Sequence, residues 1–209
     1  TKRKFIFFQK VLLKLYKFLF SSSNVHLIFE NNDDADLFLK ERVVNRKKFT
    51  LIKGAGVDTK KIIPSNFNEG VVTIVLVARM LWDKGVGEFV EAAKIVKKTV
   101  DAEFILVGGV DSENPMGIEN NILHDWVEEG VVKWSGYSDN VIDILRRAHI
   151  ACLPSYREGL PKSLIEAASA GLPIVTTDVP GCREVVRHNF NGLIVPARDS
   201  NSLSNALLL

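Results

Sequence analysis

The sequence predicts an α/β protein built on a parallel sheet of about six strands, with helices on both faces. Two observations predict this fold: short apolar runs recur after residue 70, and helical patterns separate them. Most of the runs are unbroken Val, Ile and Leu stretches, which is typical of strands that are buried on both faces. Alternation of such strands with helices is typical of a doubly wound, Rossmann-like domain.

Each element of this domain has its own local signal. Strands are expected at 71–78, 103–107, 131–134, 150–154, 174–176 and 193–195. Helices are expected at 87–99, 117–128, 140–147, 161–170, 183–187 and 200–209. Pro161 suits the first turn of its helix, where no backbone donor is needed. Gly171 suits the position just past the end of that helix, where φ is often positive.

The residues before this alternation are interpreted as a separate part of the chain. We divide the chain into residues 1–66 and a sheet domain at 67–209. Residues 25–30 (VHLIFE) and 50–52 predict short strands. The strand at 25–30 has no obvious partner, so we interpret it as the last strand of a preceding domain. The stretch at 64–70 is rich in turn-forming residues and is expected to be a connector.

Residues 1–20 (TKRKFIFFQKVLLKLYKFLF) have the pattern of a basic amphipathic helix. Lys10, Lys14 and Lys17 recur at helical spacing and interrupt the apolar run, so a membrane-spanning helix is not predicted. Two interpretations stay open. The helix packs against another part of the protein with its lysines in water, or it lies on an anionic bilayer surface.

Charge and cysteine content exclude several classes of function. The net charge is +2, which gives no indication of a nucleic-acid partner. Cys152 and Cys182 have no C-x-x-C spacing and no signal peptide is apparent, so we expect free thiols in the reducing cytoplasm and no zinc site. No G-x-G-x-x-G follows the first strand of the domain, so a dinucleotide cofactor is not indicated.

Candidate binding residues follow the predicted strand ends, where ligands bind in doubly wound sheets. Arg79 and Lys84 follow the first strand and could clamp a diphosphate; the alternative is two surface charges, with Arg79 paired to Asp83. Glu158 precedes the helix expected at 161–170. Glu166 lies on the second turn of that helix, and its side chain leans back toward the helix start. Both could accept hydrogen bonds from sugar hydroxyls, or simply be charges favoured at a helix start. Together the four predict a site for a sugar carried on a diphosphate.

Glycines and a tyrosine at two other strand ends are weaker candidates. Gly108 and Gly109 follow the second strand, where a plain turn explains them as well as a close ligand does. Gly136 and Tyr137 follow the third strand and could hold a flat base by hydrogen bonding and stacking. A tyrosine at such a position is more often a rim residue.

Three motifs together resemble the family 4 glycosyltransferases. They are R-x4-K at Arg79 to Lys84, E-x7-E at Glu158 to Glu166, and PGCREVV at 180–186. The stretches LWDKGVGEFVEAA and LPSYREGLPKSLIEAA look most like the bacterial branch that builds surface polysaccharides and lipid-linked oligosaccharides, which includes N-acetylhexosaminyltransferases. The resemblance covers residues 25–209.

The resemblance implies the C-terminal, nucleotide-sugar-binding half of a two-domain GT-B fold. It implies transfer of a hexosamine-type sugar from a UDP-sugar to a lipid-linked or polysaccharide acceptor, with retention of anomeric configuration. No metal or other cofactor is implied, because positive side chains would neutralise the diphosphate. The protein would be cytoplasmic, with the inner face of the cytoplasmic membrane as a candidate partner surface.

The resemblance also assigns roles to single residues. Arg79, Lys84 and Glu158 would be the catalytic residues, the first two on the diphosphate and the third on the donor sugar. Glu166 would hydrogen-bond the ribose. The remaining substrate-binding residues would be Gly159, Leu160, Pro161, Gly108, Gly136 and Tyr137.

The part of the family fold that binds the acceptor has no counterpart here apart from the remnant in residues 1–66. We therefore expect these 209 residues alone not to catalyse transfer. Two alternatives stay open: a non-catalytic nucleotide-sugar-binding module, and a UDP-sugar epimerase.

Overall fold

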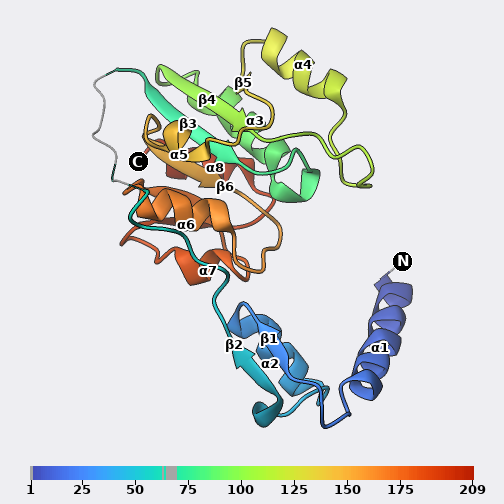
Figure 1. Cartoon of the computed structure of the whole chain (residues 1–209). Helices are drawn as coiled ribbons and strands as arrows, with labels where there is room; N and C mark the ends of the chain where they lie inside the picture. Colours follow the sequence, from blue (N-terminus) through green and yellow to red (C-terminus); the bar gives the residue numbers. More distant parts are fainter. Residues whose placement is uncertain (1, 63, 65–69) are drawn as a thin grey trace. The chain divides into compact units, whose positions relative to one another are not determined.

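The chain folds into two units, Thr1–Ala55 and Gly56–Leu209 (Figure 1). The computed structural model describes residues 2–62, 64 and 70–209. The domain boundary predicted between residues 66 and 67 lies outside the described residues, as does most of the predicted connector. No helix in the described part of the chain combines the length and the hydropathy needed to span a bilayer.

The first unit is a two-stranded parallel sheet with helical cover. Its elements are α1 (Lys2–Leu19), β1 (Leu27–Phe29), α2 (Asn32–Lys40), a 3-10 turn (Arg46–Lys48) and β2 (Phe49–Leu51). Leu27 of β1 pairs with Phe49 of β2, so the strand expected at 25–30 has a partner that its sequence did not reveal. Phe38 packs edge to face on Phe29, with ring centroids 5.1 Å apart, and Tyr16 of α1 stacks on Phe38.

The second unit contains the predicted doubly wound sheet. Its elements are β3 (Val72–Val77), the 3-10 turn η2 (Trp82–Lys84), α3 (Val86–Val96), β4 (Ala102–Val107), α4 (Asn120–Glu128), β5 (Lys133–Trp134), α5 (Val141–Leu145), β6 (Ile150–Leu153), α6 (Lys162–Ser169), β7 (Ile174–Thr177), α7 (Cys182–Val185), β8 (Gly192–Val195) and α8 (Ser200–Leu207). The six strands are all parallel and lie in the order β5-β4-β3-β6-β7-β8. The predicted fold class is therefore confirmed.

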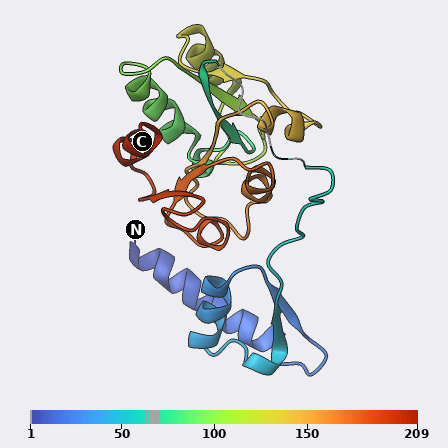
Figure 2. The same cartoon turned by 90° about the vertical axis from the view of Figure 1, so that its left-hand side faces the viewer.

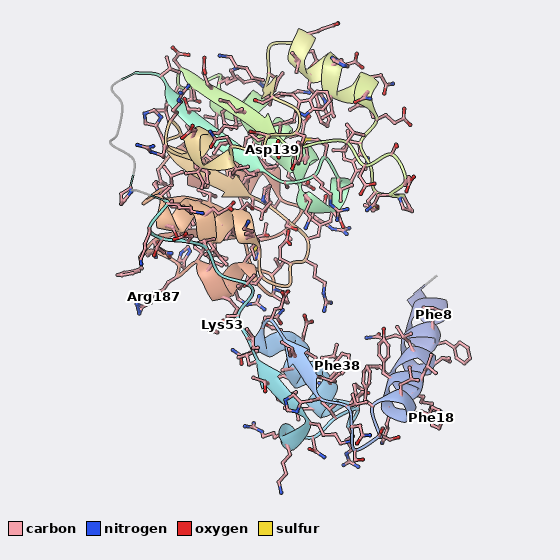
Figure 3. The ribbon with its side chains drawn as sticks, viewed as in Figure 1. Phe8, Phe18, Phe38, Lys53, Asp139 and Arg187 are labelled. Atoms are coloured by element: carbon pink, nitrogen blue, oxygen red, sulfur yellow. The ribbon has the colours of Figure 1, made fainter. Side chains whose placement is uncertain are left out.

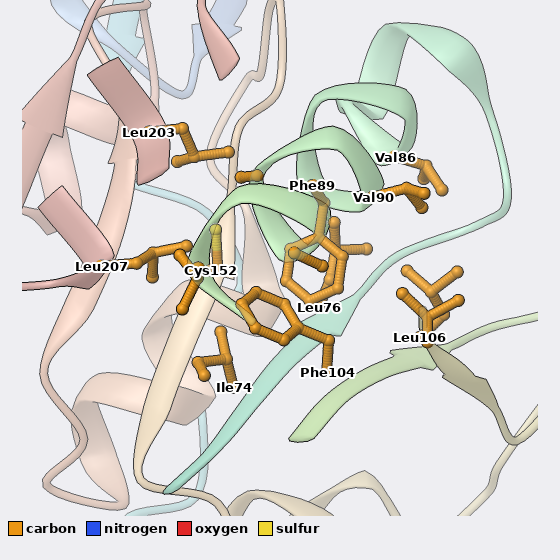
Figure 4. Packing of buried hydrophobic residues seen from close by; sticks show 14 of the residues in the cluster. Ile74, Leu76, Val86, Phe89, Val90, Phe104, Leu106, Cys152, Leu203 and Leu207 are labelled. Carbon is orange, nitrogen blue, oxygen red and sulfur yellow. The ribbon is translucent and has the colours of Figure 1, made fainter. Parts of the chain in front are cut away.

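Helices cover both faces of this sheet, as the unbroken apolar strands require (Figure 2). On one face α3 and α8 bury a cluster in which the rings of Phe89 and Phe104 meet edge to face at 5.3 Å (Figure 4). On the other face α5, α6 and α7 bury a second cluster around Leu153 and Leu164. Ile62 packs into this second cluster, which ties the chain before residue 70 to the second unit.

Several elements are shorter than their sequence patterns predict, and contacts explain this for the helix expected from residue 117. The helix expected from residue 117 begins at Asn120, because Gly117 forms a bridge with Leu81 and the Ile118 amide donates to the carbonyl of Met80 at 3.0 Å. Only two residues of the expected strand at 131–134 pair with β4. This short strand, β5, lies at the edge of the sheet, where it has a neighbour on one side only.

Candidate functional site

The order of the strands reverses between β3 and β6, and the loops after these two strands diverge to opposite faces. Such a reversal opens a crevice at the carboxyl ends of the strands. The two loops are joined there: the carbonyl of Asp83 accepts from the amide of Tyr156 at 2.8 Å and from Ser155 Oγ at 3.1 Å. Thr177, at the end of β7, donates its hydroxyl to the carbonyl of Ser155. The loop after β6 is therefore fixed by hydrogen bonds on both sides.

Lys84 and Glu158 meet at this reversal in the strand order. Lys84 Nζ lies 2.7 Å from Glu158 Oε1, and the two side chains are only 21% and 11% exposed. Gly85 allows the approach, because a Cβ at that position would lie 2.1 Å from the carbonyl oxygen of Pro154 and because its φ is +73°. The structure thus brings together one cation and one acid that the sequence placed 74 positions apart.

The turn after β7 forms another wall of the same site. A Cβ at Gly181 would lie 2.5 Å from the carbonyl oxygen of Gly159 and 2.8 Å from that of Glu158, so only glycine fits against this loop. The next residue, Cys182, is a buried free thiol. Burial raises the pKa of Cys182 to about 11, and the nearby negative charge of Glu158 adds to the rise. This thiol stays protonated at neutral pH.

Arg79 lies with a different partner. Its Nη1 atom is 2.6 Å from Asp111 Oδ2, in the loop after β4, and the Arg79 side chain is 61% exposed. The alternative pairing of Arg79 with Asp83 is not the one observed. Arg79 and Lys84, which the sequence assigned to one diphosphate, are each paired with a separate carboxylate in this structure.

Glu166 lies on the second turn of α6, as its sequence position predicts. The side chain is 14% exposed, and its Oε1 atom is 3.3 Å from Lys162 Nζ at the start of the same helix. Pro161 is buried at the N-cap and provides no side-chain hydrogen bond to the helix. Gly159 and Leu160, directly before it, are half-buried.

The candidates after β4 and β5 lie at the same edge of the sheet. The Gly108 amide donates to the carbonyl of Gly136 at 2.8 Å, and Trp134 Nε1 donates to the carbonyl of Gly108 at 2.9 Å. A Cβ on Gly108 would lie 1.7 Å from the carbonyl oxygen of Ala78. The close approach of the backbone after β3 therefore explains why glycine is needed here, without a ligand. Tyr137 is 76% exposed and has room to stack.

Three features near the site were not predicted from the sequence: the contacts of Tyr156, the buried carboxylate of Asp83, and Asp111. Tyr156 donates its hydroxyl to Glu88 Oε1 of α3 at 2.6 Å, and the guanidinium of Arg198 lies 4.3 Å from the centre of its ring. Burial, followed by the hydrogen bond to Glu88, raises the pKa of Tyr156 to about 12. Asp83 Oδ1 is buried without a hydrogen-bond partner among the described residues. Asp111 is the other missed residue, and its distance of 32 positions from Arg79 explains why spacing did not reveal it.

The remaining feature at the carboxyl ends of the strands is a hollow lined by one acidic side chain, Asp178. The hollow has a volume of about 600 Å³ and lies at the carboxyl ends of β7 and β8, lined by Asp178, His188 and residues 194–197. Among the residues that the structure describes, no three His, Cys, Asp or Glu side chains are close enough together to hold a metal ion.

Comparison with known proteins identifies the family and agrees with the fold. Residues 71–209 match the family described as glycosyl transferases group 1. The chain is 34% identical over 212 residues to the N,N'-diacetylbacillosaminyl-diphospho-undecaprenol alpha-1,3-N-acetylgalactosaminyltransferase of Campylobacter jejuni, which covers 95% of this chain and 54% of that protein. It is 28% identical to the UDP-Gal:alpha-D-GlcNAc-diphosphoundecaprenol alpha-1,3-galactosyltransferase of Escherichia coli, over 100% of this chain and 56% of that protein. The chain spans about half the length of these relatives.

Solved structures share the fold. Anabaena HepE in complex with UDP superposes with a TM-score of 0.79 at 18% identity, over 94% of this chain and 56% of that chain. Sucrose-phosphate synthase from Thermosynechococcus elongatus gives a TM-score of 0.77 at 23% identity, over 94% and 51% of the two chains. Taken with the match over residues 71–209 and the 34% identity, these findings establish that the chain belongs to the family of glycosyl transferases group 1, with a GT-B fold.

Proposed function

We propose that the second unit binds the nucleotide-sugar donor of a retaining, family 4 glycosyltransferase. The whole protein would transfer a hexosamine-type sugar from a UDP-sugar to a lipid-linked acceptor. The observation that carries the proposal is the shielded Lys84–Glu158 pair at the carboxyl ends of β3 and β6, where the strand order reverses. The names of the two relatives, which specify N-acetylgalactosaminyl and galactosyl transfer to diphospho-undecaprenol carriers, support the choice of donor and acceptor.

The proposed chemistry follows from where charge develops. In the transfer, the bond between the anomeric carbon and the β-phosphate oxygen breaks, and UDP leaves with the electron pair. The acceptor hydroxyl oxygen bonds to the anomeric carbon from the same face, and its proton passes to the departing β-phosphate oxygen. Lys84 and Arg79 would stabilise the negative charge on the leaving diphosphate, so we assign to them the role that a divalent metal plays in other transferases.

Acidic side chains would orient the rest of the donor. Glu158 would accept hydrogen bonds from sugar hydroxyls, and Glu166 from the ribose. Gly159, Leu160 and Pro161 would line the donor at the start of α6, where the helix dipole favours a diphosphate.

The proposed location of the whole protein is the inner face of the cytoplasmic membrane. A lipid-linked acceptor requires such a position. On α1, Phe8 and Phe18 project outward and are exposed, and Lys10, Lys14 and Lys17 lie on the same helix (Figure 3). Exposed aromatic and basic side chains together suit an anionic bilayer surface.

The donor-binding part of the proposal can be tested on the 209-residue chain. UDP or UDP-N-acetylgalactosamine at about 100 times its Kd should stabilise the fold by about 2.7 kcal/mol, which raises Tm by about 5–10 °C. ADP-glucose and GDP-mannose at the same concentration should produce smaller shifts. Arg79→Ala or Glu166→Ala should reduce the shift, whereas Glu103→Gln, at the amino end of β4, should keep it. Equal shifts in all variants, or none with any nucleotide sugar, would contradict the proposal.

The transfer itself needs the whole protein. Incubation with the UDP-sugar and a polyprenyl-diphosphate-linked sugar should give an α-linked product, read by the anomeric NMR coupling. Binding without transfer would favour a binding module, and conversion of the UDP-sugar without an acceptor would favour an epimerase.

A further inference from the structure

The two cations assigned to the diphosphate are held by carboxylates of different character. Lys84 and Glu158 are both shielded from water and lie against fixed loops. Arg79 and Asp111 form an equally short ion pair, but their side chains are 61% and 27% exposed. An exposed pair contributes little to stability and opens readily. A shielded pair does not open readily, because separating it leaves two charges away from water without a partner.

The backbone around Asp111 is fixed. The Met80 amide donates to the carbonyl of Gly109 at 3.0 Å, and the Trp82 amide donates to the carbonyl of Met116 at 2.8 Å. These hydrogen bonds hold the loop to the segment that follows Arg79, one before Asp111 in the chain and one after it. Asp111 itself begins a turn in which its carbonyl accepts from the amide of Asn114 at 3.2 Å.

The side chain that can move in this pair is Arg79. It is long, well exposed, and leaves the chain at the carboxyl end of β3, the edge of the sheet where the crevice opens. A diphosphate brings more negative charge than one carboxylate and accepts the two parallel hydrogen bonds that a guanidinium offers. It would therefore compete with Asp111 for the same group.

We propose that Asp111 is the resting partner of Arg79, which a nucleoside diphosphate displaces when it binds. Asp111 then sets the affinity of the site: it weakens the hold on the donor, and it takes Arg79 back when UDP leaves. Lys84 stays with Glu158 throughout and provides the fixed positive charge. This inference rests on the proposed donor site.

The test is a titration of the 209-residue chain with UDP by calorimetry at low salt. Asp111→Asn should lower Kd by about two- to fivefold, because the competing pair is exposed and weak. The advantage should shrink in about 0.5 M salt, where exposed charges are screened. Glu103→Gln is the matched control. It removes one acid from the exposed Lys133–Glu103 pair, also 2.6 Å long, and changes the net charge equally, so its Kd should stay that of the wild type.

A double variant separates release of Arg79 from simple removal of a repelling charge. In the Arg79→Ala background, Asp111→Asn should give no gain in affinity, because no guanidinium remains to be released. A gain that persists in this background would overturn the inference. So would weaker or unchanged binding by Asp111→Asn and by a second variant, Asp111→Ser, because it would mean that the acid orients Arg79 for the ligand or leaves it unaffected. Failure of the wild type to bind UDP would overturn the proposed function and this inference with it.

Discussion

Replacing Lys84 with methionine should destabilise the second unit strongly. The substitution keeps an unbranched side chain, one atom shorter, and leaves the carboxylate of Glu158, which is only 11% exposed, without its cation. Removing one partner of a fully buried ion pair costs about 3–5 kcal/mol. Because both side chains retain some contact with water, we expect a loss of about 2–4 kcal/mol here, or a fall in Tm of about 5–15 °C.

The three tryptophans make the assay specific to the unit that holds the pair. Trp82, Trp126 and Trp134 all lie in the second unit, so urea unfolding followed by their fluorescence reports on that unit. The double variant Lys84→Met/Glu158→Gln should recover part of the lost stability, since it leaves no unpaired charge. Lys133→Met, in the exposed pair with Glu103, should change the free energy of unfolding by less than about 0.5 kcal/mol. An equally small change for Lys84→Met would refute the reasoning, because the pair would then be solvated.

Three further predictions concern groups around the same site. Gly181→Ala should cost about 2 kcal/mol in the same urea assay, because its Cβ would strike two backbone carbonyls at a positive φ; a loss below about 0.5 kcal/mol would contradict the contact. Burial raises the pKa of Cys182 to about 11 and also raises that of Cys152. Ellman's reagent at pH 8 should therefore label neither thiol until urea unfolds the chain. Fast labelling of the native protein would contradict this prediction. The pKa of Tyr156 is raised to about 12 in the folded protein. The contribution of this hydroxyl to the free energy of unfolding is therefore complete below about pH 10 and is lost as the pH rises toward 12. The stability advantage of the wild type over Tyr156→Phe should therefore narrow between about pH 10 and 12, and a constant difference would count against the hydrogen bond to Glu88.

The sequence predicts the fold well because the second unit is locally consistent. The strands at 71–78, 103–107 and 150–154 are almost entirely apolar, interrupted only by Thr73 and Glu103. Each following helix shows its own apolar face, so no long-range information is needed to find these elements. Elements decided by distant contacts are less predictable. The start of α4 at Asn120 depends on a bridge between Gly117 and Leu81, which no local pattern encodes.

The candidate site shows the same division between what is local and what is not. The sequence places Arg79, Lys84, Glu158 and Glu166 correctly at strand ends and at a helix start, because strand ends in a parallel sheet share one edge. It does not give the pairing of their side chains, which depends on the order of the strands. Spacing gave no reason to expect that the loop after β4 would hold an acid opposite Arg79.

Strand order explains why the two cations differ. Lys84 faces the loop after β6, across the reversal in the sheet, where the carbonyl of Asp83, Ser155 and Thr177 tie adjacent segments together and exclude water. Arg79 faces the loop after β4, on the side where the sheet continues to its edge at β5 and the side chain stays exposed. In the proposed donor site, the same sheet edge would provide one cation that is fixed before any ligand arrives and one that exchanges partners. A site that must bind a diphosphate tightly and then release it can use both, since the first gives a constant field and the second a reversible contact.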